Sequence, residues 1–442
     1  MVELKYGSGQ VTFELPADWA AEEIPFRPYP ALPEPEAAIR QALQQPIGSP
    51  PLGAIVRPGE RVCILVNDST RLARSEVFLP LILEELNQAG VPDRDVFLVI
   101  ATGSHRQATP EDVRALVGPA VAGRVAIHSH DACDQARLTY LGTTSRGTPV
   151  YVNSLVMQAD RRILTGSVVH HWFAGFGGGK KALVPGVAGA ETIRRNHALM
   201  LDPASRMGVL DGNPAAEDML EAARLVGGDF LLNTVLDPEG RLLGVFGGDM
   251  VLAHRQACHL AHRAFAGYQT APADLVIASC GGWPKDINVY QAQKALENAV
   301  LVSPPGGVII LVAECREGIG SQKYWEWVQR YPTLPQLEQA IRQNFELGGH
   351  KAWAMARLTA HHPVVLLSSL PAETVACLGF VPAATPNEAL AVAQRLLLDS
   401  ARHGAGTGER RRAVIMPHAA LTVPLGLATQ GVHQSFALDG TL

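Results

Sequence analysis

The sequence has few of the features that mark secreted or membrane proteins. It contains six cysteines in 442 residues, and no two of them form a C-x-x-C pair. Several of these cysteines lie within apolar runs, which is typical of reduced thiols in the core of a cytoplasmic protein. No basic segment followed by an apolar one opens the chain, and no apolar run reaches the ~18–20 residues that a membrane-spanning helix needs. We therefore expect a cytoplasmic protein without a signal peptide or membrane anchor.

An excess of charge of one sign is also missing. The formal net charge is −5 and charged residues make up 18% of the chain, so nothing indicates a general attraction to nucleic acid or to an anionic membrane. A hydrophobic content of 47% is typical of a globular enzyme with a substantial core. The length predicts about two or three domains. The composition does not indicate an oligomeric state.

Three familiar ligand-binding motifs are absent. A phosphate-binding P-loop requires G-x-x-x-x-G-K-[S/T], but Ala174 stands where its first glycine would be and Lys181 where its hydroxyl residue would be. Neither a G-x-G-x-x-G dinucleotide fingerprint nor an H-E-x-x-H zinc helix fits the sequence. The chain is therefore not predicted to bind its ligand through any of these standard motifs.

What the sequence does contain is a regular alternation of apolar strands and helices. After a short hairpin at 2–15, the strands of the first part are predicted at 61–66, 96–101, 124–130, 149–157 and 161–169. Its helices are predicted at 75–89, 189–197, 215–226 and 250–268, with a further helix start at Thr109-Pro110. Such alternation indicates an α/β sheet with crossover connections.

A linker at 269–273 precedes a second pattern of the same kind. The strands of this part are predicted at 274–279, 307–314, 362–369 and 412–416, and its helices at 288–301, 334–345, 350–359 and 387–400. The predicted fold class is α/β, with two α/β domains, mainly parallel sheets and an active-site cleft between them. We place the N-terminal domain at 1–269 and the C-terminal domain at 270–442.

A glycine-rich stretch, HHWFAGFGGGKK at 170–181, follows the strand at 161–169. Glycine allows a ligand to approach the backbone closely, and the neighbouring histidines and lysines favour an anionic ligand. Other polar clusters also follow predicted strands, namely Asp68-Ser69-Thr70-Arg71, His105 and the segment 281–285. Open α/β sheets bind ligands beyond the carboxyl ends of their strands, so these clusters together predict one shared site.

Each cluster also has a structural interpretation. Asp68 and Thr70, taken alone, are better explained as helix caps than as ligand contacts. Arg71 is different, because a permanently charged guanidinium after a buried strand suits a carboxylate or a phosphate.

The histidines remain open on the residues alone. His105 is equally well explained as a structural imidazole or as a general base. His170 and His171 are adjacent, so on an extended chain they point in opposite directions and at most one of them easily faces the site.

A helix start in the second domain carries a further candidate. Tyr290 and Lys294 are four residues apart and therefore share one helix face, with Gln291 beside them. Following the glycines at 281–282, this face could bind a small carboxylate. A solvated helix face is the alternative.

The chain resembles the lactate racemase family of 2-hydroxy acid racemases and epimerases, which use a nickel-pincer nucleotide. The resemblance covers nearly the whole chain, because the motifs that carry it occur in the same order. The motifs that carry the resemblance are Asp68-x-Thr70-Arg71, Gly103-x-His105, His171-x-x-Ala174-Gly175-Phe176-x-Gly178-Gly179-x-Lys181, Asn196-His197, Tyr290-Gln291-x-x-Lys294 and Trp353. Gly177 departs from the pattern, since many members carry serine there, and this removes at most one hydroxyl contact.

The resemblance implies a cofactor and a chemistry. The cofactor would be a pyridinium-3-thioamide-5-thiocarboxylic acid mononucleotide that holds Ni(II) through one carbon and two sulfurs. Lys181 would be tethered to it as a thioamide, and His197 would be the protein ligand of the metal. His105 and His171 would be the catalytic acid/base pair, while hydride moves from the substrate carbon to the cofactor and back. Enzymes that make the cofactor would be required partners.

The resemblance also assigns the remaining site residues. The cofactor contacts would be Asp68, Ser69, Thr70, Phe173, Gly178 and Gly179, in addition to Lys181 and His197. The substrate contacts would be Arg71, Tyr290, Gln291, Lys294 and Trp353. The set around Tyr290 favours a small aliphatic 2-hydroxy acid such as lactate. Alternatives are a larger malate-like, aromatic or sugar-derived hydroxy acid, or a non-catalytic nucleotide- or carboxylate-binding protein on the same scaffold.

Overall fold

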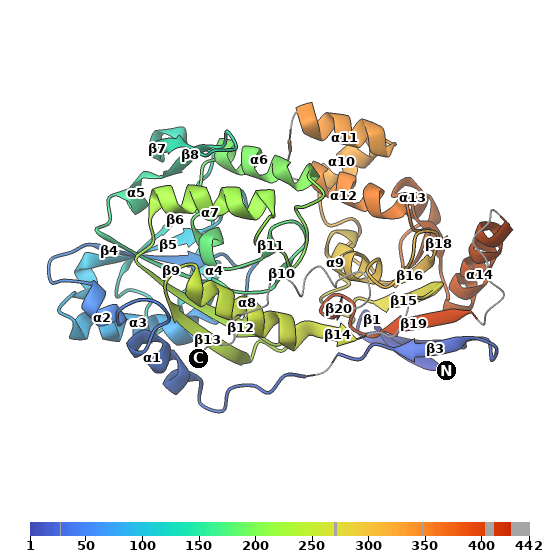
Figure 1. Cartoon of the computed structure of the whole chain (residues 1–442), viewed down its shortest axis with the longest axis horizontal. Coiled ribbons are helices and arrows are strands. Elements are labelled where there is room, and N and C mark those ends of the chain that lie inside the picture. Colours follow the sequence, from blue (N-terminus) through green and yellow to red (C-terminus); the bar gives the residue numbers. More distant parts are fainter. Residues whose placement is uncertain (27, 269–271, 344, 347, 403–410, 426–442) are drawn as a thin grey trace. The chain divides into compact units, whose positions relative to one another are not determined.

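A computed structural model describes residues 1–26, 28–268, 272–343, 345–346, 348–402 and 411–425 (Figure 1). The chain forms two compact units. One, the glycine-loop unit, is the continuous segment Pro28–Ala264. The other, the terminal unit, combines Met1–Arg27 with Phe265–Leu442. Each unit contains its own six-stranded sheet, and each is described separately below.

The sheet of the glycine-loop unit has the strand order β13-β12-β9-β4-β5-β6. The strands are β4 (Val62–Asn67), β5 (Val96–Ala101), β6 (Ala126–Ser129), β9 (Arg161–Ser167), β12 (Phe230–Leu236) and β13 (Leu242–Gly248). All neighbours are parallel except β12 and β13, which form an antiparallel pair at the edge. The inner strands are short apolar runs buried along nearly their whole length, as expected for a parallel sheet covered on both faces.

Helices and two small ribbons complete this unit. The helices are α1 (Pro35–Gln44), α2 (Leu52–Ile55), α3 (Ser75–Gln88), α4 (Pro110–Val117), α5 (Ser154–Met157), α6 (Ala190–Ala198), α7 (Pro214–Val226) and α8 (Leu252–Phe265). The ribbons pair β7 (Leu138–Thr143) with β8 (Pro149–Asn153), and β10 (His170–His171) with β11 (Gly175–Phe176). The predicted start of α4 is confirmed, because Thr109 and Asp112 form a reciprocal capping box and Pro110 occupies the first turn.

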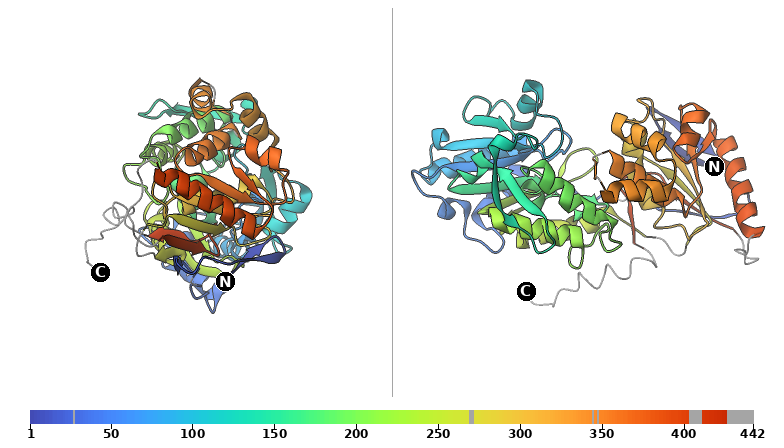
Figure 2. Two further views of the ribbon diagram at one scale, coloured as in Figure 1. Left: turned by 90° about the vertical axis from the view of Figure 1, so that its right-hand side faces the viewer. Right: turned by 90° about the horizontal axis from the view of Figure 1, so that it is seen from above.

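The terminal unit has an all-parallel sheet in the order β18-β17-β16-β15-β19-β3. Its strands are β3 (Ala20–Glu23), β15 (Leu275–Ser279), β16 (Val308–Val312), β17 (Val364–Leu367), β18 (Val381–Ala383) and β19 (Arg412–Met416). Its helices are α9 (Val289–Ala299), α10 (Gln322–Arg330), α11 (Leu334–Gln343), α12 (Gly349–Thr359), α13 (Ala372–Cys377) and α14 (Pro386–Arg402), and helices cover both faces of the sheet (Figure 2). A further short pair joins β14 (Ala266–Tyr268) to β20 (Val423–Leu425). The predicted class of two α/β domains with mainly parallel sheets is confirmed.

The division of the chain differs from the predicted boundary at its N-terminal end. The predicted hairpin is present as β1 (Val2–Tyr6) and β2 (Gly9–Phe13), but it belongs to the terminal unit rather than to the domain at 1–269. Strand β3 pairs with β19 almost 400 residues later, and the two lie side by side in Figure 1. Leu4, Phe13 and Trp19 are buried in the same core cluster as β15 and β16. Residues 1–26 therefore supply an edge strand and part of the core of the terminal unit.

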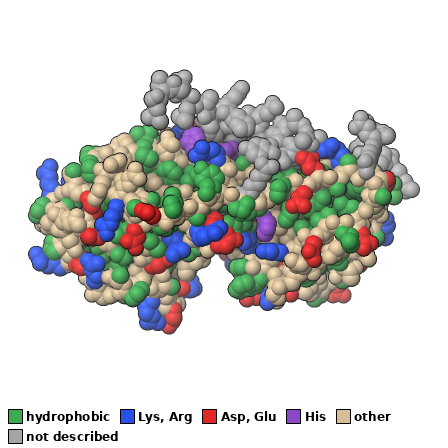
Figure 3. All heavy atoms as spheres, turned by 90° about the horizontal axis from the view of Figure 1, so that it is seen from below, with side chains coloured by type: hydrophobic (Ala, Val, Ile, Leu, Met, Phe, Trp, Pro, Cys, Tyr) green, Lys and Arg blue, Asp and Glu red, His purple; other side chains and the backbone are tan. Residues whose placement is uncertain are grey.

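No helix in the described part of the chain is long and apolar enough to cross a membrane. On the face seen in Figure 3, basic and acidic side chains are interspersed among hydrophobic and neutral ones.

A buried carboxylate joins three elements of the glycine-loop unit. Asp218 of α7 is fully buried and accepts hydrogen bonds from Thr144 Oγ1 at 2.5 Å, Thr148 Oγ1 at 2.8 Å and Asn196 Nδ2 at 2.8 Å. The threonines flank the turn between β7 and β8, and Asn196 lies on α6 next to His197. This network therefore fixes α6 against α7 and the ribbon.

We predict that Asp218→Ala lowers the free energy of unfolding of the glycine-loop unit by about 3 kcal/mol, because three buried donors lose their acceptor. Denaturant unfolding followed by circular dichroism measures the change. Arg224→Ala is the matched control, since Arg224 is exposed on the same helix. Equal and small effects of both substitutions would contradict a stabilising role for the network.

Candidate functional site

The carboxyl ends of three neighbouring parallel strands bring the predicted residues of the glycine-loop unit to one edge of its sheet. Strand β4 lies between β9 and β5 and is parallel to both. Asp68 directly follows β4, His105 follows β5 by four residues, and the glycine loop follows β9. The loops are also joined directly, because the backbone N–H of Gly103 donates to the carbonyl oxygen of Gly186 at 2.8 Å. The predicted grouping at this edge is therefore present within the unit.

Asp68 and His105 form a close pair at this edge. His105 Nδ1 lies 2.6 Å from Asp68 Oδ2, and Thr70 Oγ1 donates to Asp68 Oδ1 at 2.7 Å. Burial disfavours the charged form of Asp68, but hydrogen bonds from His105 and Thr70 outweigh it and hold the pKa of this carboxyl below its usual value. Asp68 is not a helix cap, since α3 begins only at Ser75. The carboxylate instead orients the imidazole.

Arg71 and Ser69 complete the loop after β4. The Arg71 guanidinium donates to the carbonyl oxygen of Thr70 at 3.0 Å and to its hydroxyl at 3.2 Å, and the side chain is largely exposed. Ser69 is also exposed. The loop thus presents a permanent positive charge beside the Asp68–His105 pair.

The two adjacent histidines at the start of the glycine loop diverge, as expected for extended chain. The ring of His170 packs on Phe176, with ring centroids 4.8 Å apart, and its Nε2 lies 3.4 Å from His262 Nδ1. The ring of His171 instead packs edge-on against Phe173 at 4.7 Å, and His171 Nδ1 accepts a hydrogen bond from the backbone N–H of Ala174 at 3.2 Å. Of the two, His171 is the one beside the other predicted residues.

Phe173 is the centre around which three predicted residues gather. Its ring is buried and packs against His171 on one side and edge-on against His197 of α6, with centroids 5.1 Å apart. The Lys181 amine lies 5.6 Å from the centre of the same ring. The predicted tether, the predicted metal ligand and one predicted acid/base residue therefore all surround one aromatic side chain.

The two lysines of the loop differ from ordinary surface lysines. Burial, with added repulsion from Arg71 and Lys180, holds the pKa of Lys181 well below its usual value. Burial also lowers the pKa of Lys180 to about 8. Because a depressed pKa means that more of the amine is neutral near pH 7, Lys181 is suited to act as a nucleophile.

Two residues that the sequence analysis did not assign to the site hold the glycine loop in place. Asn233 of β12 accepts a hydrogen bond from the backbone N–H of Gly179 at 2.8 Å, and the imidazole of His254 on α8 lies 2.8 Å from the carbonyl oxygen of Gly177. Gly179 has φ 55°, and a Cβ there would lie 2.5 Å from the His254 ring. Glycine is thus required at 179, and the loop is fixed from two sides just before Lys181.

The predicted substrate contacts Tyr290, Gln291, Lys294 and Trp353 lie in the terminal unit. Asn288 caps α9, because its side-chain oxygen accepts a hydrogen bond from the backbone N–H of Gln291 at 3.0 Å. The predicted helix start is therefore present. The Lys351 amine lies 4.7 Å from the centre of the Tyr290 ring. Trp353 of α12 is buried, with the Arg357 guanidinium 5.2 Å from its ring centre. The substrate-binding role of these residues remains a prediction.

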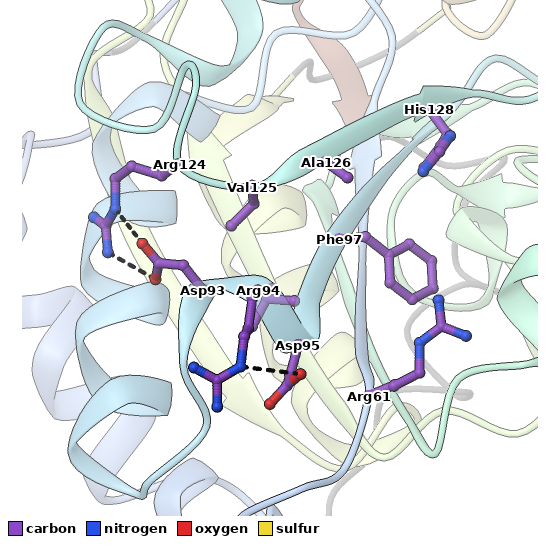
Figure 4. A pocket seen from close by; sticks show the side chains of 10 residues that line it. Arg61, Asp93, Arg94, Asp95, Phe97, Arg124, Val125, Ala126 and His128 are labelled. Carbon is purple, nitrogen blue, oxygen red and sulfur yellow. Dashed lines mark hydrogen bonds and ion pairs between the residues drawn. The ribbon is translucent and has the colours of Figure 1, made fainter.

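A hollow of about 240 Å³ lies elsewhere on the glycine-loop unit (Figure 4). It is lined at the amino ends of β4, β5 and β6 by residues that include Arg61, Phe97 and His128. The figure shows Arg124 paired with Asp93 along one wall. None of the predicted site residues lines this hollow, which lies at the opposite ends of the strands from the candidate site.

Among the residues that the structure describes, no three or more histidine, cysteine, aspartate or glutamate side chains are grouped so as to hold a metal ion. His197 is largely buried beside Phe173. It is the residue that the sequence analysis assigned to the metal.

Comparison with known proteins covers both units. Residues 6–208 match the model of the lactate racemase N-terminal domain, and residues 268–403 match that of the lactate racemase C-terminal domain. The lactate racemase of Thermoanaerobacterium thermosaccharolyticum is 30% identical over 405 residues, which cover 90% of this chain and 95% of that protein. The lactate racemase of Lactiplantibacillus plantarum is 30% identical over 347 residues, or 76% of this chain and 80% of that protein.

A solved structure agrees with this relationship, and another shows the same fold. The lactate racemase apoprotein of Thermoanaerobacterium thermosaccharolyticum superimposes with a TM-score of 0.85 at 27% identity, covering 96% of this chain and 100% of that one. A protein of Thermotoga maritima shares the fold, with a TM-score of 0.66 at 18% identity over 88% of this chain and 98% of that one. The predicted relationship is confirmed: the chain belongs to the lactate racemase family of isomerases.

Proposed function

We propose that this racemase interconverts the enantiomers of lactate or of another short aliphatic 2-hydroxy acid, using a nickel-pincer nucleotide tethered to Lys181. The observation that carries the proposal is the gathering of Lys181, His197 and His171 around Phe173. The same sheet edge carries the Asp68–His105 pair. The names of the curated relatives support lactate as the first substrate to test.

Lys181 and His197 fit such a cofactor chemically. Burial holds the pKa of the Lys181 amine well below its usual value, so more of it is present in the neutral form that attacks an activated thiocarboxylate. The imidazole of His197 is a suitable ligand for Ni(II), whose remaining soft ligands would come from the nucleotide itself. When bound, the pincer nucleotide supplies a hydride acceptor. The residues Asp68, Ser69, Thr70, Phe173, Gly178 and Gly179 are the proposed further contacts of the nucleotide.

His105 and His171 are the proposed residues that bind the substrate hydroxyl and exchange its proton. Loss of the Cα hydrogen as hydride leaves a carbonyl only if the hydroxyl proton is also removed, and an imidazole does this well near neutral pH. The hydroxyl groups of two mirror-image substrates lie in two different positions. Each position therefore needs its own imidazole to remove or return the hydroxyl proton. Arg71 is the proposed partner of the substrate carboxylate from the glycine-loop unit.

We predict that Lys181→Met abolishes covalent attachment of the nucleotide, stoichiometric nickel and racemisation, whereas Lys180→Met retains all three. Methionine fills the space of a buried lysine stem without its charge, so the two variants are matched. Intact mass, nickel analysis and a chiral assay with lactate on protein produced with cofactor-making enzymes measure the outcome. Attachment of the nucleotide at Lys180, or no attachment in the wild-type protein, would refute the proposed tether.

We predict that His105→Gln and His171→Gln each lower kcat/KM by about 10²–10⁴-fold, the range expected for loss of a proton-transfer group. Both should keep normal nickel content and the Lys181 adduct, because neither residue is a proposed ligand. His128→Gln is the control, since His128 is exposed at the amino edge of the sheet. The assay should use a panel from lactate to malate and aromatic hydroxy acids. Faster turnover of a larger acid would revise the substrate but not the mechanism.

A further inference from the structure

The surroundings of His105 determine which of its nitrogens carries the proton. Asp68 Oδ2 lies 2.6 Å from Nδ1, and an ionised carboxylate can only accept a hydrogen bond. Thr70 Oγ1 lies farther away, at 3.4 Å, and donates to the other oxygen of Asp68. Nδ1 of His105 is therefore the protonated nitrogen, and in the neutral ring Nε2 has the free lone pair.

The surroundings of His171 require the opposite nitrogen to carry the proton. A backbone N–H can only donate, and that of Ala174 points at His171 Nδ1 from 3.2 Å. Nδ1 of His171 must therefore be the unprotonated nitrogen, so the neutral ring carries its proton on Nε2. The donor cannot easily move away, because His171 pairs with Gly175 across the ribbon. A Cβ at Gly175 would lie 2.1 Å from the carbonyl oxygen of Val209, so the turn is tightly packed.

We propose that the two imidazoles rest in opposite tautomers, His105 accepting at Nε2 and His171 donating at Nε2, and that Asp68 is the positioning residue that sets the first. The proposal rests on the proposed function and gives Asp68 a role in addition to its proposed contact with the nucleotide. The resting enzyme is then prepared for only one enantiomer, the one whose hydroxyl group reaches His105.

The proton balance follows from these tautomers. As the Cα hydrogen leaves as hydride, the hydroxyl proton moves to His105 Nε2, and Asp68 offsets the charge of the imidazolium. During this step His171 donates a hydrogen bond from Nε2 and keeps its proton. When hydride returns to the other face, His171 gives its Nε2 proton to the new hydroxyl group while its Nδ1 takes up a proton from water, which breaks the contact with Ala174. His105 then releases to water the proton that it gained. In the reverse direction, His171 becomes a base only after its Nε2 proton has been lost and Nδ1 has gained one.

The two directions of the reaction must therefore differ in a defined way. Enantiomers have equal free energies, so kcat/KM is the same in both directions for every variant. The difference between the two resting tautomers can therefore appear only in kcat and KM taken separately. Both constants differ between the two enantiomers by the same factor, so that their ratio stays equal.

The test is a direct measurement of the tautomers. Long-range ¹H–¹⁵N correlation spectra of deuterated, ¹⁵N-histidine-labelled full-length protein, with and without the cofactor, are recorded at about pH 8, where imidazoles are largely neutral. His105→Gln and His171→Gln assign the signals. We expect protonated Nδ1 for His105 and protonated Nε2 for His171. The same tautomer in both residues would overturn the proposal.

Asp68→Asn adds a functional readout. The amide can donate to Nδ1 and so allow the other tautomer, and we expect the His105 signals to switch, with a fall in kcat/KM of about 10²-fold or more that is equal for both enantiomers. The signals of His171 should not move. Asp131→Asn is the control, because Asp131 bonds Gln107 and the backbone of Cys133 rather than His105. An unchanged His105 tautomer in Asp68→Asn would remove Asp68 from this role.

The two proposals fail in distinguishable ways. The wild-type spectra need no substrate and no folded variant at position 68, so they test the tautomers alone. Opposite tautomers in a protein that does not racemise hydroxy acids would contradict only the proposed function. Identical tautomers in an active racemase would contradict only the present inference.

Discussion

Parallel backbone pairing of β9, β4 and β5 is the constraint on which the candidate site depends. Parallel strands end at the same edge of a sheet, so three loops that are far apart in sequence meet there. The strands themselves are apolar and buried and contribute no chemistry. Their pairing determines the positions from which Asp68, His105 and the glycine loop extend. A change of register between β4 and its neighbours would separate these residues and at the same time displace the buried side chains of β4.

Within that frame, side chains from other elements determine the local geometry. Asn233 and His254 fix the backbone of the glycine loop, and Phe173 spaces the three residues that surround it. Asp68 and the amide of Ala174 then act on the individual imidazoles. The two imidazoles are thus oriented by hydrogen bonds to a carboxylate and to the backbone, which are more directional than apolar packing.

The sequence predicted those parts of the structure that depend on local pattern. Strands β4, β5 and β9 are continuous apolar runs, and their polar continuations were sufficient to predict a shared edge. Strand β12 was not predicted, although its sequence FLLNTVL is an apolar run like those of β4 and β5. What no single sequence shows is that its Asn233 contacts Gly179, 54 residues away. Strand β3 has the sequence AAEE, with no β-branched residue, and is stabilised by a partner at the far end of the chain. The pairing of β3 with β19 and the contact of Asn233 with Gly179 both join distant parts of the chain, so neither leaves a signal in a single sequence.

The terminal unit is built from both ends of the chain, so the glycine-loop unit is in effect an insertion within it. During synthesis, the hairpin of β1 and β2 and strand β3 emerge first, but they have no sheet to join until β15 and finally β19 have been made. The glycine-loop unit, being continuous, can complete its fold in the interval. A fragment that starts at the linker would lack Leu4, Phe13 and Trp19 from its core and would expose the edge of β19. The natural modules of this enzyme are therefore nested rather than consecutive.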